Sequence, residues 1–347
     1  MIETFRDQVR AAAANGAKLR IRGGGTKDWY GQSVEGEILD TRGYTGIVDY
    51  EPTELVITAR CGTPLSEIEA VLAEQNQMLA FEPPYFGDGA TFGGVIAAGL
   101  SGPRRANSGA LRDFVLGAQL LDGKGDSLRF GGQVMKNVAG YDVSRLLAGS
   151  LGTLGLITEA SVKVLPRPFA ETTLRFEITE IEAIRTLNEW GGQPLPLSAS
   201  CWHAGVLALR LSGAQAAVDA AVKSLGGQVL PDCAAFWAGV REQRHAFFEG
   251  DLPLWRLALP STTGAIVLKG EQLIEWGGAQ RWLRAGSDAA EAIRATVKAA
   301  GGHATLFRGG DKRVGVFQPL APAVARIHER LKASFDPAHL FNPGRMF

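Results

Sequence analysis

The chain has 347 residues, of which 36 are lysine or arginine and 36 are aspartate or glutamate, so its formal net charge is zero. This length is sufficient for about two domains, each with a core of its own. A balanced charge creates no field that would attract a polyanion, which excludes nucleic acid as an expected partner.

The sequence has no expected membrane-spanning or secretory segment. Residues 1–16 carry charges from Glu3 onward and are typical of an amphipathic helix rather than of a signal peptide. No stretch offers the roughly 18 uninterrupted apolar residues that a membrane span needs. We therefore expect a cytoplasmic protein.

Cysteine and histidine are too scattered to indicate a metal site. Cys61, Cys201 and Cys233 lie far apart and form no C-x-x-C motif, which favours buried free thiols. The five histidines show no H-x-H or H-E-x-x-H spacing. We expect no bound metal.

Helices and strands alternate in the first half of the chain. Apolar spacing predicts a helix over residues 2–14 that ends at Gly16, followed by strands at 17–22, 37–40, 46–50 and 54–60. Thr63 is a plausible N-cap, with Pro64 as the first residue of the next helix. The pattern of residues 114–132 is typical of a hairpin with an Asp-Gly turn. For residues 137–166 we expect a loop, a short helix, a glycine turn and a closing strand.

Pro166 and Pro168 mark the expected domain boundary, so we predict domains at 1–168 and 169–329. In the second domain, V-K-x-x-G-G occurs twice between a helix end and a strand, at 222–227 and 297–302. Two related α/β halves with antiparallel strands would explain this repeated motif, and a chance match explains it equally well. Residues 330–347 are expected to dock back onto the first domain.

Glycine, at 44 residues, is the most informative part of the composition. Neither the dinucleotide motif G-x-G-x-x-G nor a P-loop is present, since Asp28 and Phe92 occupy the third glycine position of the two nearest matches and Gly125 follows Gly123-Lys124. Two segments remain, R-G-G-G-T at 22–26 and A-T-F-G-G-V-I-A-A-G-L-S-G at 90–102. Their backbone N–H groups, with a helix starting near Thr91, could hold a pyrophosphate from two sides; ordinary turns are the alternative.

These segments also occur, in order, within a longer resemblance. "LRIRGGGTK", "FGDGATFGGVIAAGLSGPRR", "GYDVSRLLAGSLGTLGLITEASVKVLP" and the terminal "FDPAHLFNPGRMF" resemble the vanillyl-alcohol oxidase/PCMH flavoprotein family, and within it the FAD-binding subunits of glycolate oxidase. The resemblance implies an α+β fold in which a two-subdomain PCMH-type FAD-binding domain is joined to an α/β cap domain with an antiparallel sheet.

The resemblance also implies the cofactor-binding residues. Gly23, Gly24, Gly25 and Thr26 would bind the FAD pyrophosphate; Thr91, Gly93, Gly94, Gly99, Ser101 and Gly102 would line its other side; Gly152, Gly155 and Ile157 would close around the adenosine. For each glycine a simple turn is the alternative, and for Ile157 a place in the core. Because Thr26 occupies the position where some relatives attach flavin through histidine, we expect noncovalent FAD.

The family resemblance implies oxidation of glycolate or a similar 2-hydroxy acid, with hydride transfer to flavin N5. The sequence lacks the histidine-rich metal motif of relatives that oxidise such acids. A non-catalytic FAD-carrying subunit that needs a metal-containing partner is therefore an alternative, and a nicotinamide-dependent flavin reductase is a second. A second FAD subunit and an iron–sulfur subunit are the implied partners, and association with the inner membrane would be peripheral, through them.

Candidates for direct chemistry are few. Arginine suits a substrate carboxylate because its planar fork matches two oxygens, and Arg256, Arg308 and Arg345 are the candidates; surface or interdomain pairing is the alternative. His245 or Tyr141 could serve as the base, and an ordinary packed role is the alternative. Trp276 and Trp282 could form a wall of the pocket or pack in the core.

Overall fold

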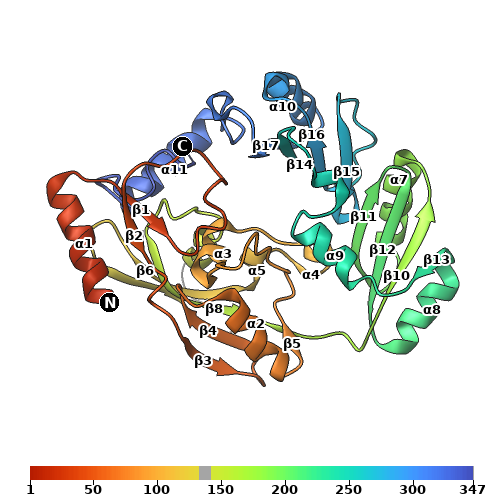
Figure 1. The fold of residues 1–347 in the computed structure, drawn as a ribbon, viewed down its shortest axis with the longest axis horizontal. Helices are drawn as coiled ribbons and strands as arrows, with labels where there is room; N and C mark the ends of the chain where they lie inside the picture. Colours follow the sequence, from red (N-terminus) through yellow and green to blue (C-terminus); the bar gives the residue numbers. More distant parts are fainter. Residues whose placement is uncertain (133–141, 347) are drawn as a thin grey trace.

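The computed structural model describes residues 1–132 and 142–346. Two lobes lie side by side (Figure 1). The first lobe contains the described residues up to Pro166 together with the C-terminal segment from Pro322, and the second lobe spans 170–308. Tyr141, a candidate base, lies outside the described residues.

The first lobe is built on a five-stranded antiparallel sheet in the order β3-β4-β8-β6-β7, with a parallel pair β1–β2 and a short antiparallel pair β5–β9. Its strands are β1 Leu19–Arg22, β2 Glu37–Asp40, β3 Ile47–Glu51, β4 Val56–Arg60, β5 Gln77–Met78, β6 Val115–Leu121, β7 Ser127–Gly131, β8 Leu156–Lys163 and β9 Leu165–Pro166. Its helices are α1 Ile2–Asn15, α2 Leu65–Glu74, α3 Phe92–Ala98, α4 Arg105–Ser108, α5 Leu111–Phe114, α6 Val143–Leu147 and α11 Pro322–Phe335.

Local sequence explains most of these elements. Helix α1 buries Phe5, Val9 and Ala12, which share one helical face, and it ends at Gly16 in the left-handed conformation, as predicted. Helix α2 differs by one residue: Pro64 is the N-cap, because the Thr63 hydroxyl is engaged elsewhere and accepts a hydrogen bond from the N–H of Gly46 at 2.9 Å.

The main core of the first lobe lies between the five-stranded sheet and the helices α2 and α3. Ile57 of β4, Leu72 of α2 and Phe92 of α3 are fully buried there. Helix α11 packs against the same core, where the ring of Phe335 lies 6.0 Å from that of Phe130. The first and last parts of the chain are thus joined in one lobe.

The second lobe is a single eight-stranded antiparallel sheet in the order β13-β10-β12-β11-β15-β16-β14-β17. Its strands are β10 Ala170–Glu177, β11 Leu197–His203, β12 Val206–Gly213, β13 Gln228–Leu230, β14 Leu254–Ala258, β15 Glu271–Glu275, β16 Gln280–Arg284 and β17 His303–Arg308. Its helices are α7 Glu180–Gly191, α8 Gln215–Leu225, α9 Ala234–Arg241 and α10 Ala290–Ala299, with short 3-10 turns η1 Ala246–Phe248, η2 Trp276–Gly278, η3 Ser287–Ala289 and, after β17, η4 Lys312–Val314.

The strand order divides this sheet into two matching halves. The order β13-β10-β12-β11 is mirrored by β17-β14-β16-β15, and β11 pairs with β15 where the halves meet. The two V-K-x-x-G-G segments connect α8 to β13 and α10 to β17, which are equivalent edge positions. The repeat therefore has a structural counterpart, as one of the two alternatives from sequence predicted.

Charged side chains join the lobes. Glu82 of the first lobe accepts hydrogen bonds from Arg104 at 3.1 Å and from Arg210 of β12 at 2.9 Å, and Glu171 of β10 also binds Arg104. Glu242, at the end of α9, accepts from the backbone N–H of Phe86 at 2.9 Å. These contacts fix the second lobe over the loops that follow β5 and α3.

Candidate functional site

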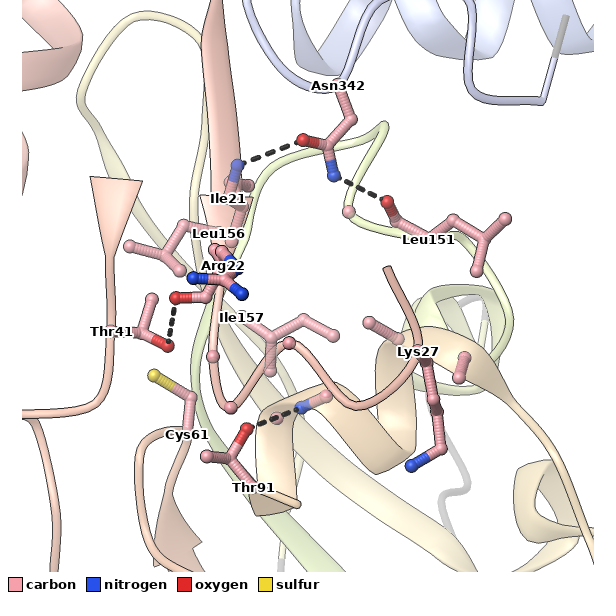
Figure 2. Close-up of a pocket in the computed structure, with 18 of the residues that line it drawn as sticks. Ile21, Arg22, Lys27, Thr41, Cys61, Thr91, Leu151, Leu156, Ile157 and Asn342 are labelled. Carbon is pink, nitrogen blue, oxygen red and sulfur yellow. Dashed lines mark hydrogen bonds between the residues drawn. The ribbon is translucent and has the colours of Figure 1, made fainter. Parts of the chain in front are cut away.

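A cleft in the first lobe contains most of the predicted cofactor residues. It is bounded by the loop after β1, the start of α3, the turn before β8 and the C-terminal segment (Figure 2). The predicted residues that line it are Gly23, Gly24, Gly25, Thr26, Thr91, Gly93, Gly94, Gly152, Gly155 and Ile157. Ile21, Ala97, Leu151 and Leu156 give part of its wall an apolar character.

The loop after β1 presents a run of unused hydrogen-bond donors. Within the described part of the chain, no hydrogen bond is donated by the backbone N–H groups of residues 23–27. These half-exposed residues line the cleft, so their free N–H groups are available to a bound acceptor, and an anion suits a run of backbone donors.

Gly24 shows why this loop has no side chains. A Cβ atom at Gly24 would lie 1.4 Å from the carbonyl oxygen of Gly89, so the loop and the segment before α3 can approach each other only as bare backbone. Gly24 is therefore required for packing between two protein segments, whatever the cleft holds.

Gly94 has a different role on the opposite wall. Thr91 caps α3, and its hydroxyl accepts a hydrogen bond from the N–H of Gly94 at 3.4 Å (Figure 2). A Cβ atom at Gly94 would approach only the Thr91 hydroxyl, at 3.1 Å, and would otherwise point into open space. The missing side chain at Gly94 thus leaves room in the cleft without serving a protein contact.

The C-terminal segment closes one side of the cleft. The side chain of Asn342 accepts from the N–H of Ile21 at 2.9 Å and donates to the carbonyl of Leu151 at 2.7 Å (Figure 2). The guanidinium of Arg345 donates to the carbonyls of Lys27 and Tyr30 at 3.1 and 2.7 Å. Arg345 is thus a structural tie to the glycine loop, and the structure does not support it as a substrate clamp.

Burial changes the ionisation of two groups in the cleft wall. Burial lowers the pKa of Lys27 to about 8, although Glu242 opposes this effect, and the ammonium donates to the carbonyl of Tyr85 at 3.1 Å. Burial raises the pKa of the Cys61 thiol to about 12, so this cysteine stays protonated and unreactive at neutral pH.

Three predicted cofactor residues lie outside this cleft. Gly99 ends α3 and packs against Gly149. Ser101 and Gly102 line a second, smaller cavity between the lobes, which we call the interlobe cavity; the Ser101 hydroxyl accepts from the N–H of Leu111 at 3.0 Å. The sequence did not separate the two sites because α3 and the loop after it contribute to both.

The remaining chemical candidates are dispersed. Arg256 and Trp282 line the interlobe cavity, and the indole N–H of Trp276 donates to the carbonyl of Gly102 at 3.1 Å. Arg308 lies in a separate surface pocket with Arg284, and its guanidinium donates to the carbonyl of Phe248. The ring of His245 accepts from the N–H of Phe247 at 3.2 Å and lines neither site, so neither Arg308 nor His245 is supported.

Sequence reasoning missed Glu275, a buried carboxyl group in the wall of the interlobe cavity. Its carboxylate oxygen Oε2 accepts from Trp282 Nε1 at 2.6 Å and from Gln280 Nε2 at 3.1 Å. Alternation along 271–275 could have signalled it, because Glu275 shares a strand face with the apolar Leu273.

Across the described residues, no three His, Cys, Asp or Glu side chains lie together as metal ligands would. No helix in the same part of the chain has the length and apolar character needed to cross a bilayer.

Comparisons with known proteins show the family of this chain. Residues 2–131 match the family described as an FAD binding domain. Over 341 residues the chain is 50% identical to glycolate oxidase subunit GlcE of Escherichia coli (strain K12), covering 98% of this chain and 96% of that protein. The chain belongs to the GlcE-type family of FAD-binding proteins. Its cofactor is FAD and it is an oxidoreductase of the flavoprotein class, as the sequence predicted.

Other relatives match a smaller part of the chain. Glycolate oxidase subunit GlcD of Bacillus subtilis (strain 168) is 36% identical over 40% of this chain and 29% of its own length. The mitochondrial D-lactate dehydrogenase [cytochrome] 1 of Saccharomyces cerevisiae is 32% identical over 41% of this chain and 26% of its own. A solved alkyldihydroxyacetonephosphate synthase superposes with a TM-score of 0.67, covering 98% of this chain and 75% of that one, at 16% identity, which confirms the predicted fold class.

Proposed function

We propose that this chain is the FAD-carrying subunit of a glycolate oxidase complex and supports the oxidation of glycolate or a similar small 2-hydroxy acid to the 2-oxo acid. The observation that carries the proposal is the cleft, which is lined by residues 23–27 with their unpaired N–H groups and is left open at Gly94. FAD suits such a lining, because its diphosphate is an anion that the N–H donors can bind, and its ring systems can lie against the apolar walls.

Different residues of the cleft would bind different parts of the cofactor. The N–H groups of residues 23–27 would hold the pyrophosphate, with Gly94 leaving room on the opposite wall, while Gly152, Gly155 and Ile157 would enclose the adenosine. Bound FAD would supply the hydride acceptor, and the protein would contribute orientation and electrostatics. Thr26 occupies the region where some relatives attach flavin through histidine, and no histidine occurs before His203, so attachment would be noncovalent.

The proposed complex includes a second FAD subunit and an iron–sulfur subunit. The chain has only three cysteines, fewer than the four thiolates that usually hold one iron–sulfur cluster. Electrons that leave the flavin would therefore pass to a partner subunit. The GlcE and GlcD relatives, both named as glycolate oxidase subunits, support assembly into a complex.

The test of FAD binding is Gly94→Val, compared with the wild-type chain. The added Cβ atom approaches only the Thr91 hydroxyl, so the fold should persist, while FAD should bind at least about tenfold more weakly because the cleft is filled. FAD released on denaturation, measured by fluorescence, reports the binding. Gly24→Val is a poor test, since its Cβ would collide with Gly89. A Gly94→Val protein with full FAD content would contradict the proposed site.

Catalysis by this chain alone is tested with glycolate under anaerobic conditions. Loss of flavin absorbance in the isolated chain would show that it oxidises the acid itself. Loss that occurs only after a GlcD-type partner is added would instead favour the alternative of a non-catalytic FAD-carrying subunit.

A further inference from the structure

The interlobe cavity lies next to the proposed FAD cleft. Ala97 and Ala98 of α3 line the cleft, and Leu100, Ser101 and Gly102, which follow directly in the chain, line the cavity. Its opposite wall comes from one face of the second-lobe sheet, through Arg256 of β14, Glu275 of β15 and Trp282 of β16. A small ligand there would lie between the two lobes.

Arg256 is a guanidinium without a protein partner. Within the described residues it makes no hydrogen bond or salt bridge, and its guanidinium lies over the ring of Phe307, 5.6 Å from the ring centroid. A half-buried guanidinium in a cavity wall keeps N–H donors available, and these donors suit an anionic ligand.

Arg105 adds a second positive charge beside Arg256. Its guanidinium lies over the ring of Trp276 at 4.5 Å and, among the described residues, also forms no side-chain hydrogen bond or salt bridge. Burial lowers the pKa of Arg105, the charge of Asp113 opposes this effect, and the charges of Arg256 and Arg112 lower the pKa further, so Arg105 and Arg256 are close enough to repel each other. An anion bound at Arg256 would relieve that repulsion.

Glu275 supplies the complementary group. Trp282 and Gln280 both donate to its Oε2, and no hydrogen bond in the described part of the chain reaches Oε1. Because two donors fix Oε2, the free Oε1 is left as an oriented acceptor in the cavity wall.

We propose that the interlobe cavity binds a small 2-hydroxy acid, with Arg256 holding its carboxylate and Glu275 Oε1 accepting the hydrogen bond of its hydroxyl group. This proposal rests on the proposed function and names the residues that would recognise its substrate class. Arg105 contributes through its charge.

The test is calorimetric titration of the FAD-loaded chain with glycolate and with acetate, which lacks the hydroxyl, at about pH 8, where Glu275 is ionised. The flavin is reduced beforehand with dithionite so that no turnover occurs. The wild-type chain should bind glycolate more tightly than acetate. Arg256→Met should weaken both ligands by about tenfold or more, since a hydrogen bond to a charged group is lost, and Arg256→Lys should weaken both by less.

Glu275→Gln should act on the hydroxyl alone. The amide oxygen must turn toward Trp282 and Gln280, which leaves an NH2 donor where Oε1 was an acceptor. The preference for glycolate over acetate should therefore disappear while acetate still binds. The matched control is Arg308→Met, which removes the same charge from the neighbouring strand β17 but lines a different pocket and should leave both affinities unchanged.

An Arg256→Met protein that binds both ligands like the wild type would overturn the carboxylate role, and a Glu275→Gln protein that keeps its preference for glycolate would overturn the hydroxyl role. These outcomes are separate from failure of the proposed function. A wild-type chain that retains no FAD would contradict the proposed function, whereas titration of that same chain would still report whether Arg256 binds acetate.

Discussion

Glu275 is a carboxyl group that folding removes almost completely from water. It is 3% exposed, and burial raises its pKa to about 7 despite the hydrogen bonds from Trp282 and Gln280. The negative charge of Glu82 raises the pKa of Glu275 further. The other groups that face Glu275 are Arg256 and Arg241, which line the same cavity, and Cys201 of β11, which pairs with Glu275 in the sheet. Between pH 4.5 and about 7 the folded chain holds a proton that the unfolded chain releases, so stability falls as pH rises through this window.

Removing this ionisation should therefore change the pH dependence of stability. Glu275→Gln should match the wild type near pH 4.5 and exceed its free energy of unfolding at pH 8 by up to about 3 kcal/mol. Urea denaturation of the chain without added acid, at both pH values, measures the difference. The same difference at both pH values would show that Glu275 ionises normally in the folded chain.

At the scale of elements, the C-terminal segment depends on one buried ion pair. Lys332 of α11 donates to Asp336 at 2.6 Å, and Asp336, fully buried, accepts from the N–H groups of Leu340 and Phe341 at 2.9 and 2.8 Å. Asp336→Ala leaves Lys332 buried without its counter-charge, which should cost about 3–5 kcal/mol.

The Asp336→Ala variant should also free the segment that carries Asn342. Limited proteolysis should then remove residues after α11, and FAD content should fall because Asn342 no longer fixes Ile21 beside the glycine loop. The exposed Glu329 of the same helix provides the control, since Glu329→Ala should leave proteolysis and FAD content unchanged. Full FAD content in a chain with a cleaved tail would show that the segment is dispensable for the cleft.

For the whole molecule, the orientation of the lobes rests on Glu82. Its carboxylate pairs with Arg104 and Arg210, whose side chains are 9% and 3% exposed. Glu82→Gln leaves two buried guanidiniums with only Glu171 as a charged partner, which should destabilise the chain by about 3–5 kcal/mol and uncouple the lobes. Calorimetry should show two transitions where the wild type shows one. Glu189→Gln, which breaks an exposed pair with Arg185, should cost no more than about 0.5 kcal/mol, and equal effects of the two changes would argue against the interlobe role.

Much of the fold follows from local patterns. The apolar spacing of Phe5, Val9 and Ala12 and the stop at Gly16 predict α1, because one helical face must be covered and glycine tolerates the left-handed end. The predicted hairpin corresponds to β6 and β7, which pair in antiparallel register from Gly117 to Leu121. The glycine segments that line the cleft were also visible in the sequence, since bare backbone beside a hydroxyl residue is an uncommon pattern.

The sequence by itself determined the α+β class and the FAD cofactor through its resemblance to a flavoprotein family, and that resemblance also named most residues that line the cleft. The motifs that carry the resemblance lie within single segments, so they are visible without the fold. Only the tertiary structure decided which charged groups meet. Arg256 and Glu275 lie on strands separated by β16, and Arg345 reaches a loop more than 300 positions earlier in the chain. Pairing between distant strands and the burial of unpaired charge are properties of the folded chain, so no local pattern could distinguish Arg256, which faces the interlobe cavity, from Arg345, which ties down the tail.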